Sequence, residues 1–105
     1  MKIKTIDVNA KEWFDKVNGN SYFSAVITLN HGLKDSKDIK LPFQCGYGDQ
    51  YQFEALKEIK KQFKGMVEGG SLWSYCNNNH IILKAVMDEN CLQREVKSFG
   101  GVSNE

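Results

Sequence analysis

Alternation of apolar and polar side chains predicts β-strands in the first half of the chain, because a period of two residues places neighbouring side chains on opposite faces. The clearest alternation covers residues 22–29, with these apolar positions: Phe23, Ala25, Ile27 and Leu29. A second alternating segment covers residues 38–43, with apolar side chains at Ile39, Leu41 and Phe43. Pro42 lacks an amide donor, so we expect residues 38–43 to form an edge strand or the strand to end near Pro42. Shorter strands are expected at residues 2–8 and 80–87.

Residues 9–17 fit two different structures. Asn9 and Glu12 have the spacing of a helix capping box, which favours a helix. Asn18-Gly19, in contrast, is the dipeptide that most readily forms a type I′ turn, and it stands directly before a clear strand. We therefore interpret residues 9–17 as one arm of a β-hairpin and keep the helix as the alternative.

The main predicted helix covers about residues 50–64. Its apolar side chains recur at spacings of 3, 4 and 3 residues, on one helical face: Leu56, Ile59, Phe63 and Met66. Asp49 can cap the first turn, and Gly65 is a natural end for the helix. Two shorter helices are expected within residues 69–79 and 92–99.

These elements predict an α+β fold in a single domain, residues 1–100. The prediction is an antiparallel sheet of about four strands that packs against the main helix, with short additional helices. The chain has 105 residues, of which 41% are hydrophobic, and this is the size of one ordinary domain. Residues 101–105 are expected to form a frayed tail.

Charge and hydropathy exclude several function classes. The chain has 14 basic and 13 acidic residues, so a net charge of +1 gives no long-range attraction to nucleic acid or acidic membranes. No apolar run approaches the length of a signal-peptide core or a membrane span. We therefore expect neither export nor a transmembrane segment.

Cysteine spacing gives no sign of a disulfide framework or a metal site. Cys45, Cys76 and Cys91 are odd in number and match no paired-cysteine pattern. Cys76 and His80 are four residues apart and would meet on a helix, but the asparagines between them are expected to break it. We therefore expect no metal, no cofactor and no cysteine nucleophile, and take each thiol as a small buried hydrophobe.

A glycine-rich loop, Gly46 to Gly48, precedes the main helix and resembles loops that bind phosphate. Asp49 argues against this interpretation, because a carboxylate at the cap would take up the free amides and repel an anion. A tight turn that leads into the helix is the simpler explanation.

The main helix carries four lysines that could form a contact surface for phosphate groups: Lys57, Lys60, Lys61 and Lys64. The simpler explanation is that they complement the helix dipole and pair with glutamates three residues before them, as Glu54 with Lys57. Arg94 is the only arginine, which disfavours base recognition in nucleic acid.

Aromatic residues make up 11% of the chain, more than one face of a small sheet must bury. Exposed tyrosine and tryptophan are favoured anchors in protein interfaces. Together with the four lysines, we predict these aromatic residues as partner contacts: Tyr22, Tyr47, Tyr51 and Trp73. The alternative is that the aromatic side chains mostly fill the core.

Two segments resemble small bacteriophage-encoded proteins without a known active site. They are residues 13–25, WFDKVNGNSYFSA, and residues 41–51, LPFQCGYGDQY. The resemblance covers about a third of the chain, and Cys45 replaces an aromatic residue that is often found there. It implies a protein that acts in the cytoplasm of a bacterial host, where such proteins often bind host proteins, including CRISPR nucleases and other defence systems.

The leading hypothesis is a non-enzymatic protein that binds a host protein or ribonucleoprotein complex. Balanced charge, surplus aromatic residues and the lack of a recognisable catalytic group agree with it. The alternative is a small nucleic-acid-binding domain that uses the lysine-rich helix and nearby aromatic side chains. Pro42 also suggests an exposed sheet edge, through which two copies of the chain could form a homodimer.

Overall fold

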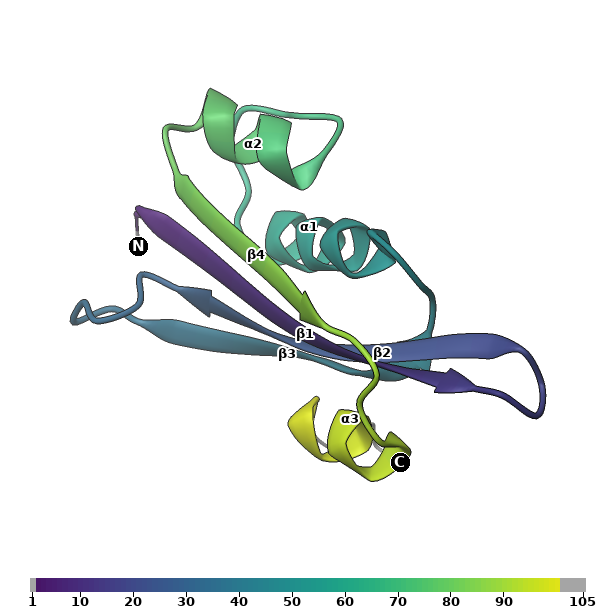
Figure 1. The fold of residues 1–105 in the computed structure, drawn as a ribbon. Helices are drawn as coiled ribbons and strands as arrows, with labels where there is room; N and C mark the ends of the chain where they lie inside the picture. The colour runs from purple at the N-terminus through teal and green to yellow at the C-terminus, as the bar shows by residue number, and fades with distance from the viewer. Residues whose placement is uncertain (1, 101–105) are drawn as a thin grey trace.

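The computed structural model describes residues 2–100 and has an α+β fold, which confirms the predicted class (Figure 1). Its elements are β1 (Thr5–Asp15), β2 (Asn20–Leu29), β3 (Lys37–Cys45), α1 (Gln50–Gln62), α2 (Leu72–Asn78), β4 (Ile82–Asp88) and α3 (Gln93–Phe99). The tail predicted at residues 101–105 lies outside the described residues. None of the helices in residues 2–100 is long and apolar enough to cross a membrane.

The four strands form one sheet in the order β3-β2-β1-β4. β1, β2 and β3 pair antiparallel as predicted, but β4 runs parallel to β1, so the sheet is mixed rather than antiparallel throughout. The reason is the long connection through α1 and α2, which returns the chain to the far side of β1 in the same direction. The position of β3 at an edge agrees with the expectation from Pro42.

Residues 9–17 belong to β1 and to the turn that follows it, as the hairpin interpretation predicted. The predicted type I′ turn at Asn18-Gly19 is wrong, because only Gly19 of the two has a positive φ, at 71°. The turn instead spans Lys16 to Gly19, and the Gly19 amide donates to the Asp15 carbonyl at 2.7 Å. The Asp15 carboxylate accepts from the Val17 amide at 3.0 Å. These bonds close the turn with two more residues than expected.

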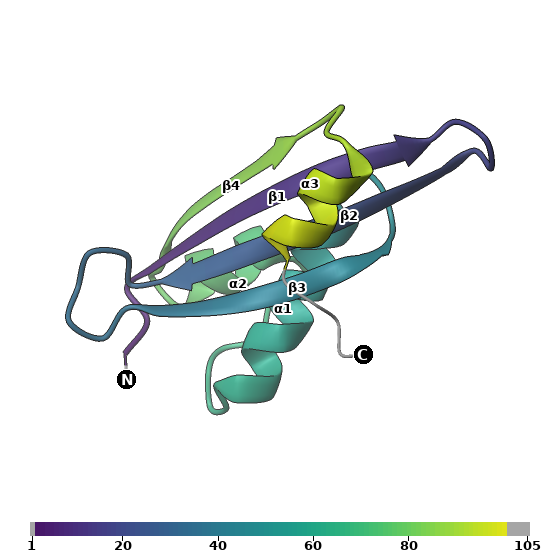
Figure 2. The same cartoon turned by 90° about the horizontal axis from the view of Figure 1, so that it is seen from below.

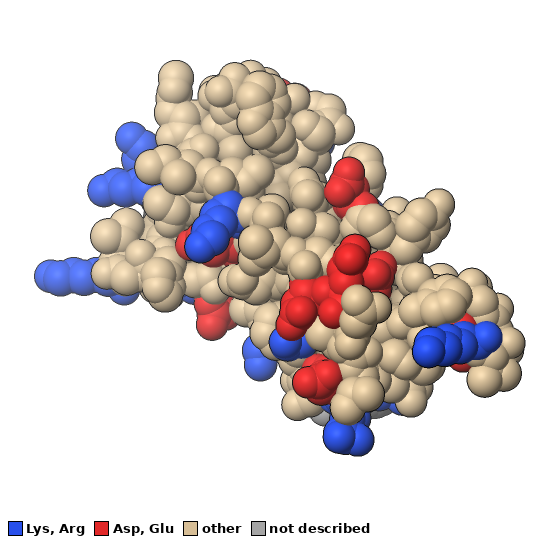
Figure 3. Space-filling model, in the orientation of Figure 1, with Lys and Arg blue, Asp and Glu red and all other residues tan. Residues whose placement is uncertain are grey.

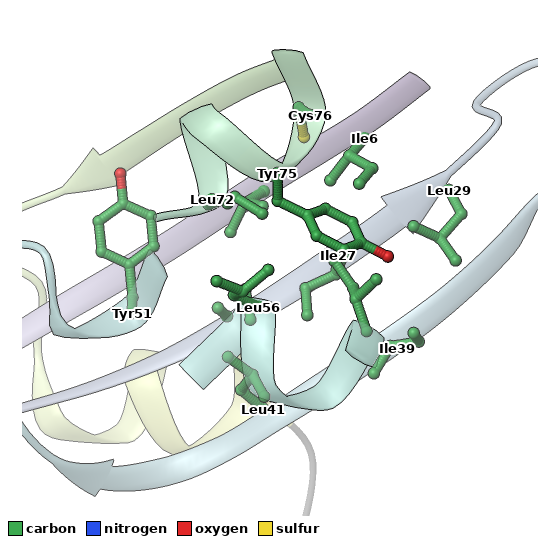
Figure 4. Close-up of a cluster of buried hydrophobic side chains, with 14 of the residues drawn as sticks. Ile6, Ile27, Leu29, Ile39, Leu41, Tyr51, Leu56, Leu72, Tyr75 and Cys76 are labelled. Carbon is green, nitrogen blue, oxygen red and sulfur yellow. The ribbon is translucent and has the colours of Figure 1, made fainter. Parts of the chain in front are cut away.

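The main core lies between one face of the sheet and helices α1 and α2 (Figures 1 and 4). Ile6, Phe23 and Ile27 are fully buried on the sheet side. α2 covers the β4 side of this face and contributes Tyr75, which is only 1% exposed. The Ser71 hydroxyl begins α2 by accepting from the Ser74 amide at 3.1 Å, which satisfies a free donor of the first turn.

Helix α1 begins at Gln50 as predicted, but it lacks the expected capping bond and ends two residues early. Asp49 occupies the N-cap position, but its side chain accepts no capping hydrogen bond, so the capping prediction is wrong. At the other end, Phe63 is extended and the helix does not reach Lys64. Phe63 packs against the edge of the core instead, and Gly65 turns the chain with a φ of 81°.

The opposite face of the sheet is covered by α3, which crosses β1, β2 and β3 (Figure 2). The buried Ser24 hydroxyl donates to the Val96 carbonyl and ties α3 to β2. Gly100, at the end of α3, lies so close to the sheet that a Cβ there would be 2.5 Å from the Leu41 carbonyl oxygen. α3 therefore depends on one hydroxyl and one residue without a side chain for its close approach.

Candidate interaction surface

The predicted lysine surface on α1 is mostly paired with acidic groups. Lys57 lies 3.6 Å from Glu54, and Lys60 lies 2.6 Å from Glu68. Lys61 likewise lies 3.6 Å from Glu58, so both predicted pairs along the helix are present. Lys64 is exposed beyond the end of α1. On the face drawn in Figure 3, Lys and Arg side chains lie scattered between acidic ones rather than in one patch.

Tyr51 does not fit its predicted role as a partner contact, because it is only 4% exposed and lies in the core (Figure 4). Tyr51, Ala55 and Ile59 follow one another every four residues and share the buried face of α1. That spacing was the signal for burial, and it extends the predicted apolar stripe by one turn toward the N-terminus.

Tyr47 and Trp73 are exposed as predicted, at 77% and 66%. Tyr47 lies in the loop before α1, whereas Trp73 lies on α2, and Figure 1 shows these segments in different parts of the fold. The structure does not join them into one continuous site.

Tyr22 is half-buried and clusters with Trp13 and Phe43, whose own ring centres are 6.2 Å apart, and we term this group of three rings the aromatic ladder. The Trp13 and Tyr22 ring centres are 5.5 Å apart, and those of Tyr22 and Phe43 are 5.0 Å apart. The rings come from adjacent strands on the face that α3 covers. The Lys97 amine lies over the Phe43 ring, 5.2 Å from its centre.

The sequence did not reveal the ladder because the turn type sets the register of a hairpin. In the structure Trp13 is opposite Tyr22, and Asp15 is opposite Asn20. A two-residue turn at Asn18-Gly19 would instead have placed Trp13 opposite Ser24. The sequence therefore predicted the hairpin, but the turn type that it suggested gives another register.

A groove of about 440 Å³ lies beside the ladder, and we term it the arm groove. One wall is the end of the β1–β2 hairpin, and the other is the loop between β4 and α3. Its lining residues are Trp13, Phe14, Asp15, Lys16, Val17, Asn90, Cys91 and Leu92. Three of them are exposed apolar side chains: Phe14 at 48%, Val17 at 92% and Leu92 at 50%.

The backbone holds the loop wall of the arm groove in place. The Cys91 amide donates to the Glu12 carbonyl at 2.9 Å, which fixes the loop to β1. The Leu92 amide donates to the Glu95 carboxylate at 2.7 Å at the start of α3. Asn90 has a φ of 63°, a left-handed conformation that asparagine tolerates better than most residues. The groove is therefore formed by hydrogen-bonded segments.

Ionisable groups near the groove have shifted pKa values. Burial raises the pKa of Glu12, and the nearby Glu89 carboxylate raises it further. Burial also raises the pKa of the Cys91 thiol, which is therefore protonated at neutral pH. A thiolate is the nucleophilic form of cysteine, so these conditions disfavour nucleophilic chemistry at Cys91.

Cys76 and His80 do not share a helical face, and only Cys76 is buried. Cys76 is buried in α2, and burial raises the pKa of its thiol to about 11. α2 ends before His80, which is exposed and has a φ of 57°. Within residues 2–100, no group of three or more potential ligand side chains could hold a metal ion.

Comparison of the chain with protein families, with curated proteins and with solved structures gives no match.

Proposed function

We propose that this protein is a non-enzymatic interaction protein and that it binds a protein partner through the arm groove. The observation that carries the proposal is the group of exposed apolar side chains at the groove: Phe14, Val17 and Leu92. Apolar side chains that line a concave surface gain free energy when a partner removes them from water. Because the hairpin and the loop are hydrogen-bonded, little conformational entropy is lost on binding.

The proposed partner is a host protein or ribonucleoprotein complex in a bacterial cytoplasm. This part of the proposal rests on the resemblance of residues 13–25 and 41–51 to phage-encoded proteins. Inhibition of a defence complex is the form of activity that the resemblance favours. A net charge of +1 agrees with a partner recognised by shape and apolar contact more than by charge.

The nucleic-acid alternative has less support from the arrangement of side chains. The lysines of α1 are mostly paired with glutamates, as Lys60 is with Glu68. In the aromatic ladder, Trp13, Tyr22 and Phe43 are each only partly exposed and contact one another, which leaves less ring surface to stack on bases.

A capture experiment with matched variants tests the proposal. Val17→Asp places a charge at the groove, and Val67→Asp makes the same change at another exposed valine, which is 55% exposed and outside the groove. Tagged protein is incubated with bacterial lysate, and the retained proteins are identified by mass spectrometry. We expect the wild type and Val67→Asp to retain the same protein and Val17→Asp to lose it.

Equal retention by both variants would refute the role of the arm groove. Retention of RNA or DNA that salt removes, with no enriched protein, would instead support the nucleic-acid alternative.

A further inference from the structure

β4 is an edge strand whose outer backbone groups have no partner within the sheet. It pairs only with β1, and the Ile82 amide donates to the Lys4 carbonyl at 3.1 Å. In a strand, the amide and carbonyl of successive residues point to opposite sides. The backbone groups of Ile82, Lys84 and Val86 therefore point toward β1, and those at positions 83, 85 and 87 point outward.

The outer side of β4 is accessible for pairing. Figure 2 shows β4 at the border of the sheet, with no other element outside it. Ile82 and Val86 lie on the α3 face of this strand and are 73% and 45% exposed. Leu83 and Met87 lie on the other face and pack partly against the core, which holds the strand in place.

We propose that β4 pairs antiparallel with β4 of a second copy of this chain, so that two sheets join into one continuous sheet. Edge strands with free backbone groups are ready templates for such pairing. This inference is independent of the arm groove, and either proposal can fail without the other.

Charge selects the register of the pairing. Lys84 and Asp88 lie on the same face of β4, and Asp88 also forms an ion pair with Lys11 of its own chain at 3.1 Å. Within residues 2–100 no carboxylate lies within ion-pair distance of Lys84. When Val86 faces Val86 of the second copy, Lys84 faces Asp88 of the second copy on both sides of the two-fold axis. A register centred on Lys84 would place like charges directly opposite, which is unfavourable.

The same register satisfies the outward backbone groups. With Val86 on the axis, Ala85 is directly opposite Met87 of the second copy, and both present their amides and carbonyls outward. Directly opposed residues of this kind exchange two hydrogen bonds in an antiparallel pair. Val86 then sits in a non-hydrogen-bonded pair, where the Cα atoms are about 4.5 Å apart.

Disulfide trapping tests this register. Val86→Cys is made in a Cys45→Ser background, because Cys45 is the exposed native thiol. We expect Val86→Cys to form a covalent dimer with oxidised glutathione, since disulfides bridge Cα atoms about 4.4–6.8 Å apart. Ile82→Cys is the matched control on the same face and is more exposed, but its Cα atoms would be roughly 27 Å apart in the dimer at ~3.4 Å per residue.

Faster cross-linking of Ile82→Cys than of Val86→Cys would overturn the proposed register, because random collisions favour the more exposed thiol. Light scattering over a concentration series tests the dimer itself. We expect the apparent mass to approach twice that of the monomer, and a monomer at the highest soluble concentration overturns the proposal.

Two further variants separate a specific pairing from general association. Lys84→Glu should return the protein to a monomer, because the new carboxylate would lie opposite Asp88 of the second copy. Ala85→Pro should abolish the dimer without breaking a bond to β1, because its amide points outward. Dimers that persist in Lys84→Glu and in Ala85→Pro would contradict pairing through β4.

Discussion

The two faces of the sheet are built in different ways. Beneath α1 and α2, side chains such as Ile27 and Phe23 are completely excluded from solvent. Beneath α3, the aromatic ladder is only partly covered, and a single short helix is held by Ser24 and Gly100. The difference indicates that the first face supplies most of the stability, whereas the second supports the surface that we propose for binding.

The largest expected effect comes from truncation on the α1 and α2 face. Ile27→Ala should lower the free energy of unfolding by about 2–5 kcal/mol, because it removes buried methyl groups and leaves a cavity. Val26→Ala, on the α3 face of the same strand, is the matched control and should cost less, since Val26 is only partly buried. Urea denaturation measures both, and equal losses would contradict the difference between the faces.

The next effect concerns the close contact between the end of α3 and the sheet. Gly100→Val should cost about 1–3 kcal/mol, because the added atoms would collide with the Leu41 carbonyl and the Ser24 side chain. Gly70→Val is the control, since a Cβ at Gly70 has no neighbour within 4 Å. Hydrogen exchange should show lost protection in α3 for Gly100→Val only. Unchanged exchange in α3 would mean that the helix does not depend on this close approach.

A smaller effect is expected at the hydrogen bond that ties α3 to β2. Ser24→Ala should lower stability by about 0.5–1.5 kcal/mol, because the Val96 carbonyl loses one of its two donors and keeps only the Gly100 amide at 3.3 Å. Ser98→Ala, at an exposed position of α3, should have little effect. Thermal unfolding of the two variants compares them, and the same melting temperature in both would rule out a role for the hydroxyl.

The smallest effect is electrostatic and concerns Glu12. Its pKa is raised in the folded state by burial and by Glu89, so the folded protein binds the proton more tightly than the unfolded chain. Stability from this group is therefore present at low pH and is lost as the pH rises through the folded-state pKa. Glu12→Gln should remove this loss and make the protein slightly more stable at neutral pH.

Denaturation at several pH values measures the effect of Glu12→Gln, with Glu89→Gln as a companion variant that removes only the repulsion. A Glu12→Gln protein that loses more stability than the wild type as the pH rises would show that the carboxylate is favourably bound.

The two edges of the sheet also differ in sequence. β3 contains Lys37, Lys40 and Pro42, which are residues that discourage pairing at an edge. β4 has a single lysine, Lys84, which lies between the exposed apolar side chains of Ile82 and Val86. Pro42 allowed the β3 edge to be predicted from the sequence, but nothing in the local pattern of residues 80–87 indicated that this strand is the other edge.

The candidate site was harder to predict than the fold. Tyr22 was predicted to be an exposed aromatic residue but is half-buried, and its ring partners depend on a turn whose type was misjudged. Val17 and Leu92 were not selected, because they belong to segments 75 residues apart in the sequence. Their contribution to one groove depends on the parallel return of β4 beside β1.

The sequence by itself determined the alternation in residues 22–29, the apolar stripe of α1 and the existence of a hairpin, because each depends on residues that are close in the chain. Only the tertiary structure decided the direction of β4, the ring partners of Tyr22 and the composition of the arm groove. These features depend on which distant segments pack together. A periodic pattern of apolar residues predicts which face of an element is buried, but it does not predict which other element covers that face.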